Sequence, residues 1–274
     1  LVLFDYFLNQ FGKSNLKELA GKLNDPDYEG YDENQHTFYH NYLIQLCTIN
    51  NNAKVSKDKL SLYDENICRY VKQIGEKRGG IMLKYFQYIS LLFTEMFLDR
   101  YFTERDSFIE DLNNYLNEKR NNSLGQVDFK PYTPESMRKL AFMCATGSGK
   151  TLLMHINILQ YIHYFKKARR VNSRLEINNI ILLAPSHGLA LQHLNELKLS
   201  SINAVIFQKD LSYFSSNKDS VVIIDMNKLK EEGVKTTVSI DSFEQNNLVM
   251  VDEAHRGLSG DVWYDYRTRL SAEG

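Results

Sequence analysis

The residues with the clearest chemistry form a glycine-rich run, Ala145-Thr146-Gly147-Ser148-Gly149-Lys150-Thr151. It follows an apolar run at 140–145 that we interpret as a strand, and it opens a helical stretch. Glycine lets the backbone curl until its N–H groups face phosphate oxygens, and the positive N-terminal end of the next helix adds to that attraction. In such a loop Lys150 reaches the β and γ phosphates as a point charge, and Thr151 offers its hydroxyl to Mg²⁺. The run therefore predicts that these seven residues bind the phosphates of a nucleotide with Mg²⁺, and many nucleotide-binding families share such a loop. Together with the acidic pair at 252–253, the expected nucleotide is ATP.

A pair of acidic residues follows a second hydrophobic run. Residues 248–251 lead into Asp252-Glu253-Ala254-His255. A carboxylate at the C-terminal tip of a strand lies where open α/β sheets bind their ligands. Asp252 is then the metal ligand, and Glu253 orients and deprotonates the attacking water. Phosphoryl transfer needs mainly positioning and charge neutralisation, so we predict ATP hydrolysis with Glu253 and Lys150 as the catalytic residues.

These two motifs carry a resemblance. GSGKT at 147–151 and DEAH at 252–255 resemble motifs I and II of the superfamily 2 DEAD/DEAH-box helicases. Cys144 departs from the general pattern, which has glycine there; we interpret it as a small buried residue at a strand end. The segment 256–263 after DEAH resembles the restriction-type branch, near the helicase subunits of Type III restriction enzymes and related phage-defence helicases. The resemblance extends over roughly residues 140–265 and implies that His255 couples hydrolysis to motion.

Two segments between the motifs bear on nucleic acid. The run from Pro185 to Gln192 is similar to motif Ia, which touches the nucleic-acid backbone in that family, and Ser239 begins a segment similar in position to motif Ib. Ser186 and the following helix N-terminus can donate hydrogen bonds to a phosphate. The resemblance implies contacts to DNA, with duplex favoured, at Pro185, Ser186, Gln192 and Ser239. The alternative interpretation of the first segment is a simple strand-to-helix turn.

Recognition of adenine leaves two interpretations open for Gln87. The family commonly uses a glutamine upstream of motif I, and Gln87 opens an aromatic helical stretch. In that interpretation residues 103–135 are an insertion between the glutamine and the phosphate loop. The alternative is a helix that faces the core and carries Gln87 on its polar side.

The surrounding pattern must position these groups. Continuous apolar runs alternate with helical stretches at 150–165 and up to residue 198, which is typical of a buried parallel sheet. The predicted strands are 180–184, 202–207, 221–225, 236–240 and 248–251. Upstream, spacings of three and four predict helices at 60–74 and 81–102. We therefore predict an α/β fold, a RecA-like P-loop NTPase lobe at 81–274, incomplete, after a mostly helical region at 1–80.

Composition, cysteine count and net charge indicate which cellular location and which mode of nucleic-acid binding to expect. Hydrophobic residues make up 43% and charged residues 24%, as in soluble globular proteins, and no apolar run has the length of a membrane span. Three cysteines do not suggest a disulfide framework, so we expect a reducing, cytoplasmic location. A net charge of −1 provides no global basic field, so nucleic acid must be bound through a local groove.

One further pattern could bind metal. His36 and His40 lie four positions apart and could share a helix face. No second ligand pair accompanies them in the sequence, and Tyr39 and Tyr42 favour ordinary packing.

Motif III and the second motor lobe do not appear before Gly274, so we expect the chain to be the N-terminal part of a larger protein. The isolated piece should hydrolyse ATP weakly, because arginines of the second lobe complete such sites. The expected function is an ATP-dependent DNA helicase or translocase lobe in restriction or anti-phage defence. Its expected partners are duplex DNA, the second lobe, and a nuclease, methyltransferase or other defence subunit. The alternatives are a P-loop ATPase that remodels protein partners and an interaction module that only binds nucleotide.

Overall fold

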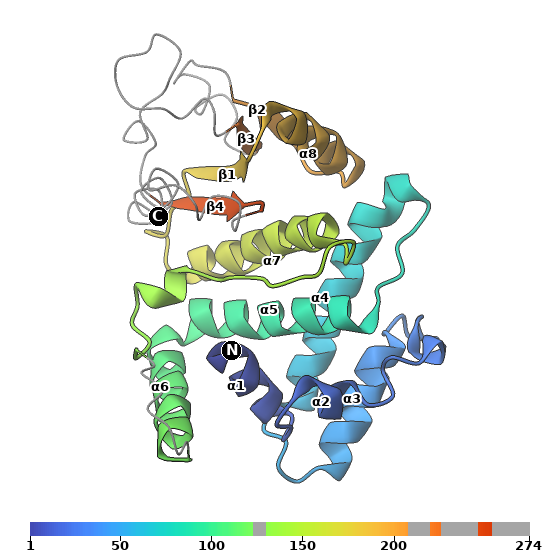
Figure 1. Ribbon diagram of the computed structural model, residues 1–274, viewed down its shortest axis with the longest axis vertical. Helices are drawn as coiled ribbons and strands as arrows, with labels where there is room; N and C mark the ends of the chain where they lie inside the picture. Colours follow the sequence, from blue (N-terminus) through green and yellow to red (C-terminus); the bar gives the residue numbers. More distant parts are fainter. Residues whose placement is uncertain (123–129, 208–219, 226–245, 254–274) are drawn as a thin grey trace. The chain divides into compact units, whose positions relative to one another are not determined.

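The computed structural model describes residues 1–122, 130–207, 220–225 and 246–253 (Figure 1). The chain forms two compact units, residues 1–168 and 169–274. The first unit is helical and contains the phosphate loop. The second unit carries the sheet and the described part of DEAH, Asp252 and Glu253.

The first unit confirms the expected helical region. Its helices are α1 (Val2–Gln10), α2 (Leu16–Ala20), α3 (Phe38–Ile49), α4 (Lys57–Gly75), α5 (Tyr85–Thr103), α6 (Arg105–Asn122) and most of α7 (Lys150–Val171). Short 3-10 turns lie at η1 (Pro26–Tyr28), η2 (Glu76–Arg78) and η3 (Ser136–Arg138). Side-chain caps begin three of the described helices of this unit: Asn15 accepts from the backbone N–H of Glu18, Thr37 from that of His40, and Ser56 from that of Lys59. Such caps satisfy donors that the first turn of a helix leaves open.

The core of this unit is built around α5. Figure 1 shows α5 between α7 on one side and α1 on the other. Its middle is buried on every side, including Leu91 and Leu92, which have no exposed surface. Buried residues of α1, α3, α4, α6 and α7 pack into the same hydrophobic core. The predicted domain boundary at residue 80 therefore falls inside one packed unit, between α4 and α5.

The segment predicted as an insertion, 103–135, is largely helical. Helix α6 occupies most of it and packs against α1 and α5. Phe108 on α6 is fully buried, and its ring packs edge-on against the ring of Phe97, with the two ring centroids 5.6 Å apart. This segment therefore contributes to the core of the first unit.

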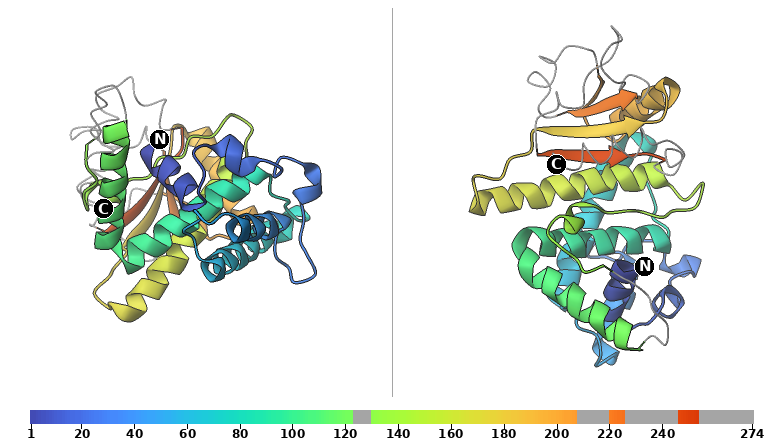
Figure 2. Two further views of the ribbon diagram at one scale, coloured as in Figure 1. Left: turned by 90° about the horizontal axis from the view of Figure 1, so that it is seen from below. Right: turned by 60° about the vertical axis from the view of Figure 1, so that its left-hand side comes forward.

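In the part of the second unit that the structure describes, four strands form a parallel sheet in the order β2-β3-β1-β4. The strands are β1 (Asn179–Ala184), β2 (Ala204–Ile206), β3 (Val221–Asp225) and β4 (Asn247–Val251). They confirm four of the predicted strands, and the fifth, 236–240, lies outside the described residues. Helix α8 (His187–Leu199) packs against β1, β2 and β3, as Figures 1 and 2 show. The carboxyl ends of β1, β3 and β4 therefore meet at one edge of the sheet.

The strand expected before the phosphate loop is a wrong prediction. Residues 139–144 have no secondary structure, and Leu140, Phe142 and Met143 are 37%, 44% and 78% exposed. A strand needs a neighbour that takes up its backbone N–H and C=O groups. Within the described ranges no strand pairs with this segment. Cys144, expected to be buried, is only half-buried.

Two further observations concern the cysteines and the possibility of membrane-spanning helices. Cys47, Cys68 and Cys144 are all free thiols. In the part of the chain that the structure describes, no helix combines the length and apolar character required to cross a bilayer.

Candidate nucleotide site

The phosphate loop curls tightly ahead of α7. Gly147 and Gly149 have φ angles of 77° and 83°, in the left-handed region that favours glycine. Among the described residues, their backbone N–H groups have no protein acceptor. These donors and the N-terminal end of α7 form an anion-binding arrangement. The curled backbone that the glycine spacing predicts is therefore present.

Gln87 lies against this loop. Its Nε2 donates to the backbone oxygen of Ser148 at 2.8 Å, across a separation of 61 residues. Its Oε1 accepts from the backbone N–H of Lys84 at 2.8 Å. A Cβ atom added to Gly149 would come within 2.7 Å of Gln87 Nε2, closer than real Cβ atoms approach. Glycine is thus required at 149 both for the backbone angle and for the glutamine contact.

The loop fits the phosphates that its sequence predicts. A Cβ atom added to Gly147 would meet nothing within 4 Å, so that side of the loop faces open space. The hydroxyl oxygen of Ser148 is buried and has no hydrogen-bond partner in the described structure. Lys150 and Thr151 are half-buried in the first turn of α7. The loop therefore combines glycine N–H groups that have no protein acceptor among the described residues with an open side at Gly147, which suits a phosphate.

The acidic residues of DEAH lie at the end of β4, in the second unit. The backbone N–H of Asp252 donates to Leu183 at 3.2 Å and so extends the pairing with β1. Asp252 Oδ1 accepts from the backbone N–H of Glu253 at 2.9 Å. Glu253 has a φ of 50°, in the left-handed region, which turns the chain away from the strand. Asp252 therefore stands at the sheet edge where the sequence predicts it, while Ala254 and His255 lie outside the described residues.

His193 on α8 contacts Asp252, and the sequence did not identify it. Its Nε2 lies 3.0 Å from Asp252 Oδ2. The side chain is buried, at 6% exposure. His193 directly follows Gln192, the last residue of the motif Ia resemblance, so a clue was present. Only the strand order, which places β4 beside β1, makes the contact evident.

The described residues of the predicted nucleic-acid set lie between β1 and α8 and on α8. Ser186 caps α8, and its Oγ accepts from the backbone N–H of Leu189 at 3.4 Å. Pro185 precedes it, and Gln192 is exposed on α8. Ser239 lies outside the described residues. The structure thus places three of the four at the carboxyl-end edge of the sheet or on the helix that begins there.

A second acid lies at the same edge. Asp225 ends β3, is buried at 5% exposure, and lies 4.0 Å from Nδ1 of His187. A single acidic residue at the end of an apolar run is a weak signal in the sequence. It lies at the same edge as Asp252, with β1 between the two strands that carry these acids.

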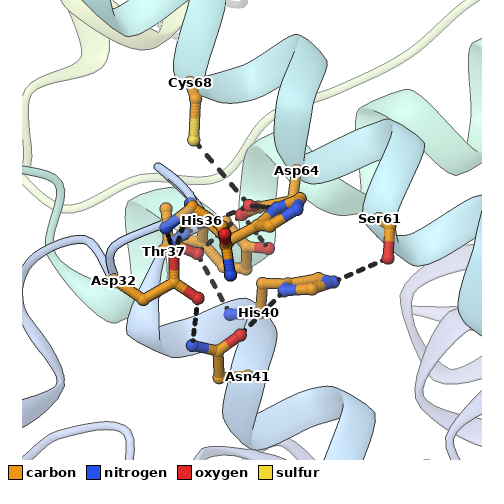
Figure 3. A network of polar contacts seen from close by, with 10 residues as sticks. Asp32, His36, Thr37, His40, Asn41, Ser61, Asp64 and Cys68 are labelled. Atoms are coloured by element: carbon orange, nitrogen blue, oxygen red, sulfur yellow. Dashed lines mark hydrogen bonds and ion pairs between the residues drawn. The ribbon is translucent and has the colours of Figure 1, made fainter.

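The two histidines at 36 and 40 form a cluster with Asp64 (Figure 3). Their donor atoms lie within 4.8 Å of one another. The rings are stacked, with centroids 4.5 Å apart and planes at 23°. Ring-nitrogen lone pairs lie in the ring planes, so those of stacked rings do not converge on one ion. His36 Nδ1 pairs with Asp64 at 2.9 Å and His40 Nε2 with Ser61 at 3.0 Å, which supports packing rather than metal binding.

Comparison with known proteins returned one family. The family described as Type III restriction enzyme, res subunit, matches residues 102–269, more than half of the chain. The match begins at the end of α5 and includes the phosphate loop, the sheet and the DEAH segment. Neither the curated proteins nor the solved structures returned a match.

Proposed function

The chain belongs to the Type III restriction enzyme res subunit family as a restriction-type superfamily 2 helicase domain, and we propose that it is the first motor lobe of an ATP-dependent DNA helicase or translocase in restriction or anti-phage defence. The family indicates a helicase-like, ATP-dependent motor domain. The finer assignments, which are ATP hydrolysis, DNA as the track and the defence role, are our proposal.

The observation that best supports the proposal is the contact between Gln87 and the phosphate loop. It brings a side-chain amide, which has both a donor and an acceptor, against Ser148 and Gly149 of the loop. We assign the loop to the phosphates and Gln87 to the adenine edge. An amide matches adenine well, because adenine presents a donor and an acceptor side by side.

The remaining roles follow from residue chemistry. Lys150 neutralises the β and γ phosphates, and Thr151 and Asp252 are the groups that would hold Mg²⁺. Mg²⁺, when bound, adds neutralisation of the developing phosphate charge. Glu253 accepts the proton of the attacking water, and His255 couples turnover to motion.

The nucleic-acid partner is assigned to the sheet edge. Pro185, Ser186, Gln192 and Ser239 contact the backbone of duplex DNA, which carries no sequence information directly. A second motor lobe supplies the arginines that complete the ATP site. A nuclease, methyltransferase or other defence subunit acts with the motor.

Lys150→Ala in the full-length protein tests the ATP site. Binding of a fluorescent ATP analogue should be lost, because the phosphates lose their principal positive partner, while circular dichroism stays unchanged. Lys72→Ala is the matched control, since Lys72 is exposed on α4. Wild-type affinity in Lys150→Ala would reject the proposed site.

A further inference from the structure

Three residues of the N-terminal helical region contact the residues on either side of Gln87. We propose that Glu29, Tyr39 and Asp64 are positioning residues of the nucleotide site, which hold Gln87 against the phosphate loop. The inference rests on the proposed function of Gln87 at that site. It gives the N-terminal region a role in nucleotide recognition, although residues 1–101 lie outside the family match.

The need for positioning arises from the place of Gln87 in its helix. Gln87 lies in the first turn of α5, which begins at Tyr85. Helix ends fray, so a contact made from a first turn is held only if that turn is fixed by its surroundings. The side chain of Gln87 also accepts from the backbone N–H of Lys84, as in a capping box. Any movement of Lys84 therefore moves the amide of Gln87.

Glu29 fixes Lys84 from the side of η1. Lys84 Nζ lies 2.8 Å from each of the two carboxylate oxygens of Glu29. The backbone of the same lysine donates to Gln87 Oε1. With Oε1 occupied by a donor, Nε2 is the atom that faces the acceptor oxygen of Ser148. The ion pair thus holds the residue that sets the orientation of the glutamine amide.

Tyr39 fixes the chain just before the helix. Its hydroxyl donates to the backbone oxygen of Leu83 at 3.0 Å. Its ring packs on the ring of Tyr88 with centroids 5.2 Å apart. Tyr39 is 2% exposed, so both contacts are made inside the core.

Asp64 fixes the residue after Gln87. Figure 3 shows this fully buried carboxylate at the centre of a polar network between α3 and α4. Its Oδ1 accepts from the hydroxyls of Tyr88 at 2.8 Å and Thr37 at 2.6 Å. Its Oδ2 accepts from the backbone N–H of Thr37 at 3.1 Å, with His36 Nδ1 at 2.9 Å. A buried carboxylate is tolerated only when it is hydrogen-bonded in this way, so the network holds Tyr88 in one place.

The charge state of Tyr88 is consistent with this role. Burial, with the neighbouring charge of Asp64, raises the pKa of Tyr88 well above its usual value. The phenol therefore stays protonated and donates to Asp64 throughout the physiological range. Gln87 is consequently bracketed by residues 83, 84 and 88, and each of these is held by the N-terminal region.

Nucleotide affinity in the full-length protein tests the inference. Glu29→Gln and Asp64→Asn should each weaken binding of a fluorescent ATP analogue by about tenfold, the change that corresponds to roughly 1.4 kcal/mol. They should also reduce the preference for ATP over GTP analogues, since Gln87 loses its orientation. Glu18→Gln is the matched control, because Glu18 is exposed and its carboxylate accepts hydrogen bonds from Ser14 and Asn15, none of which the inference uses. Lys84→Arg should keep wild-type binding, since it preserves the pair with Glu29, whereas Lys84→Gln should not.

A double-mutant cycle separates positioning from general destabilisation. In a Gln87→Ala background, Glu29→Gln should have no further effect on ATP affinity, because its influence passes through Gln87. Additive effects in the cycle would overturn the inference, as would an unchanged preference for ATP in both single variants. If Gln87→Ala itself binds ATP normally while Lys150→Ala does not, the inference fails and the proposed ATP site stands. Thermal unfolding of the Glu29→Gln protein, whose altered residue lies near the surface, checks that it is folded.

Discussion

Single residues at this site serve more than one purpose. Gly149 provides a left-handed backbone angle and also leaves room for Nε2 of Gln87. Gly147 has a similar angle but faces open space. Glycine at 149 is therefore favoured by its backbone angle and by the Gln87 contact, whereas glycine at 147 is favoured by its backbone angle. Only the structure distinguishes the two cases.

The roles assigned to Asp252 and Glu253 lead to different predictions. Glu253→Gln should keep the affinity for Mg–ATP but lose hydrolysis, because a carboxamide cannot take the proton of the attacking water. Asp252→Asn should instead raise the Mg²⁺ concentration needed for nucleotide binding. Turnover and nucleotide binding, both measured against Mg²⁺ concentration, check this prediction. Glu176→Gln, at an exposed position of the same unit, is the control. Identical behaviour of the two variants, with turnover retained, would show that the roles are wrongly assigned.

Motifs that are contiguous in the sequence are easier to predict than contacts between residues that are far apart in it. The phosphate loop and DEAH are contiguous runs, so residue type and order were enough to predict them. Gln87 was ambiguous because its partner Ser148 is 61 residues away, and the contact depends on how α5 packs. His193 was missed because its link to Asp252 depends on strand order, which no local pattern contains.

Secondary-structure elements also differ in how well the sequence predicts them. The strands at 180–184, 221–225 and 248–251 were predictable because a buried parallel strand is a continuous apolar run. The run at 140–145 has the same pattern, yet it forms no strand among the described residues. An apolar run indicates that a segment favours burial. Whether it forms a strand also depends on a neighbouring strand with which its backbone can pair.

The link between α8 and β4 makes a prediction about Mg²⁺. His193 contacts Asp252 Oδ2 at 3.0 Å, so it orients the carboxylate assigned to the metal. A hydrogen bond to a charged group contributes about 1.5–3 kcal/mol, so His193→Ala should raise the half-saturating Mg²⁺ concentration by roughly tenfold or more. His193→Gln, which keeps a donor at similar reach, should show a smaller change.

The measurement for His193 is the Mg²⁺ dependence of ATP turnover without DNA. Asn195→Ala is the control, because Asn195 is exposed on the same helix. A purely structural role would lower the melting temperature and leave the Mg²⁺ dependence unchanged. That result would remove His193 from the proposed site.

The contact of α5 with α4 and α7 predicts a dependence of stability on pH. Glu95 has no exposed surface. Its oxygens accept hydrogen bonds from Asn66 at 2.9 Å, Gln160 at 2.8 Å and Tyr164 at 2.7 Å. Burial raises the pKa of Glu95 to about 7, although these hydrogen bonds act in the opposite direction. The folded state therefore holds a proton on Glu95 that the unfolded state releases at lower pH.

The sign of the effect follows from this difference in bound protons. Between the usual glutamate pKa of about 4.3 and about 7, the folded state binds more protons, so stability falls as pH rises. The loss should be on the order of 3 kcal/mol across that range. Chemical denaturation of the wild type and of Glu95→Gln at several pH values checks it, since other titrating groups cancel in the comparison. Parallel pH profiles of the two proteins would contradict the prediction.

The whole chain combines a family domain with a region outside it. The family match begins at residue 102, whereas Gln87, which touches the phosphate loop, lies on α5 upstream of that point. The hydrophobic core also runs through both parts of the first unit without interruption. The N-terminal helices are therefore structurally inseparable from the nucleotide loop, and a variant that begins at residue 102 should lose its Gln87 contact together with most of its core.

The net charge affects how the full-length protein is expected to bind nucleic acid. The chain has a net charge of −1, so no global attraction supplements contacts to the nucleic-acid backbone. We predict that duplex DNA stimulates the ATPase of the full-length protein and that this stimulation falls steeply with salt, because phosphate contacts release counterions.

The decisive measurement is the ATPase rate with duplex DNA, single-stranded DNA, RNA and no polymer, at two salt concentrations. Backbone contacts at Ser186 and Gln192 should give little dependence on base sequence, so two duplexes of unrelated sequence serve as the control. Equal rates in all four conditions would reject the motor and favour an ATPase that remodels protein partners or a module that only binds nucleotide. Stimulation by RNA alone would keep the motor and overturn the choice of DNA. That choice rests on the resemblance around motif Ia and after DEAH, where the structure describes only the first of the two segments.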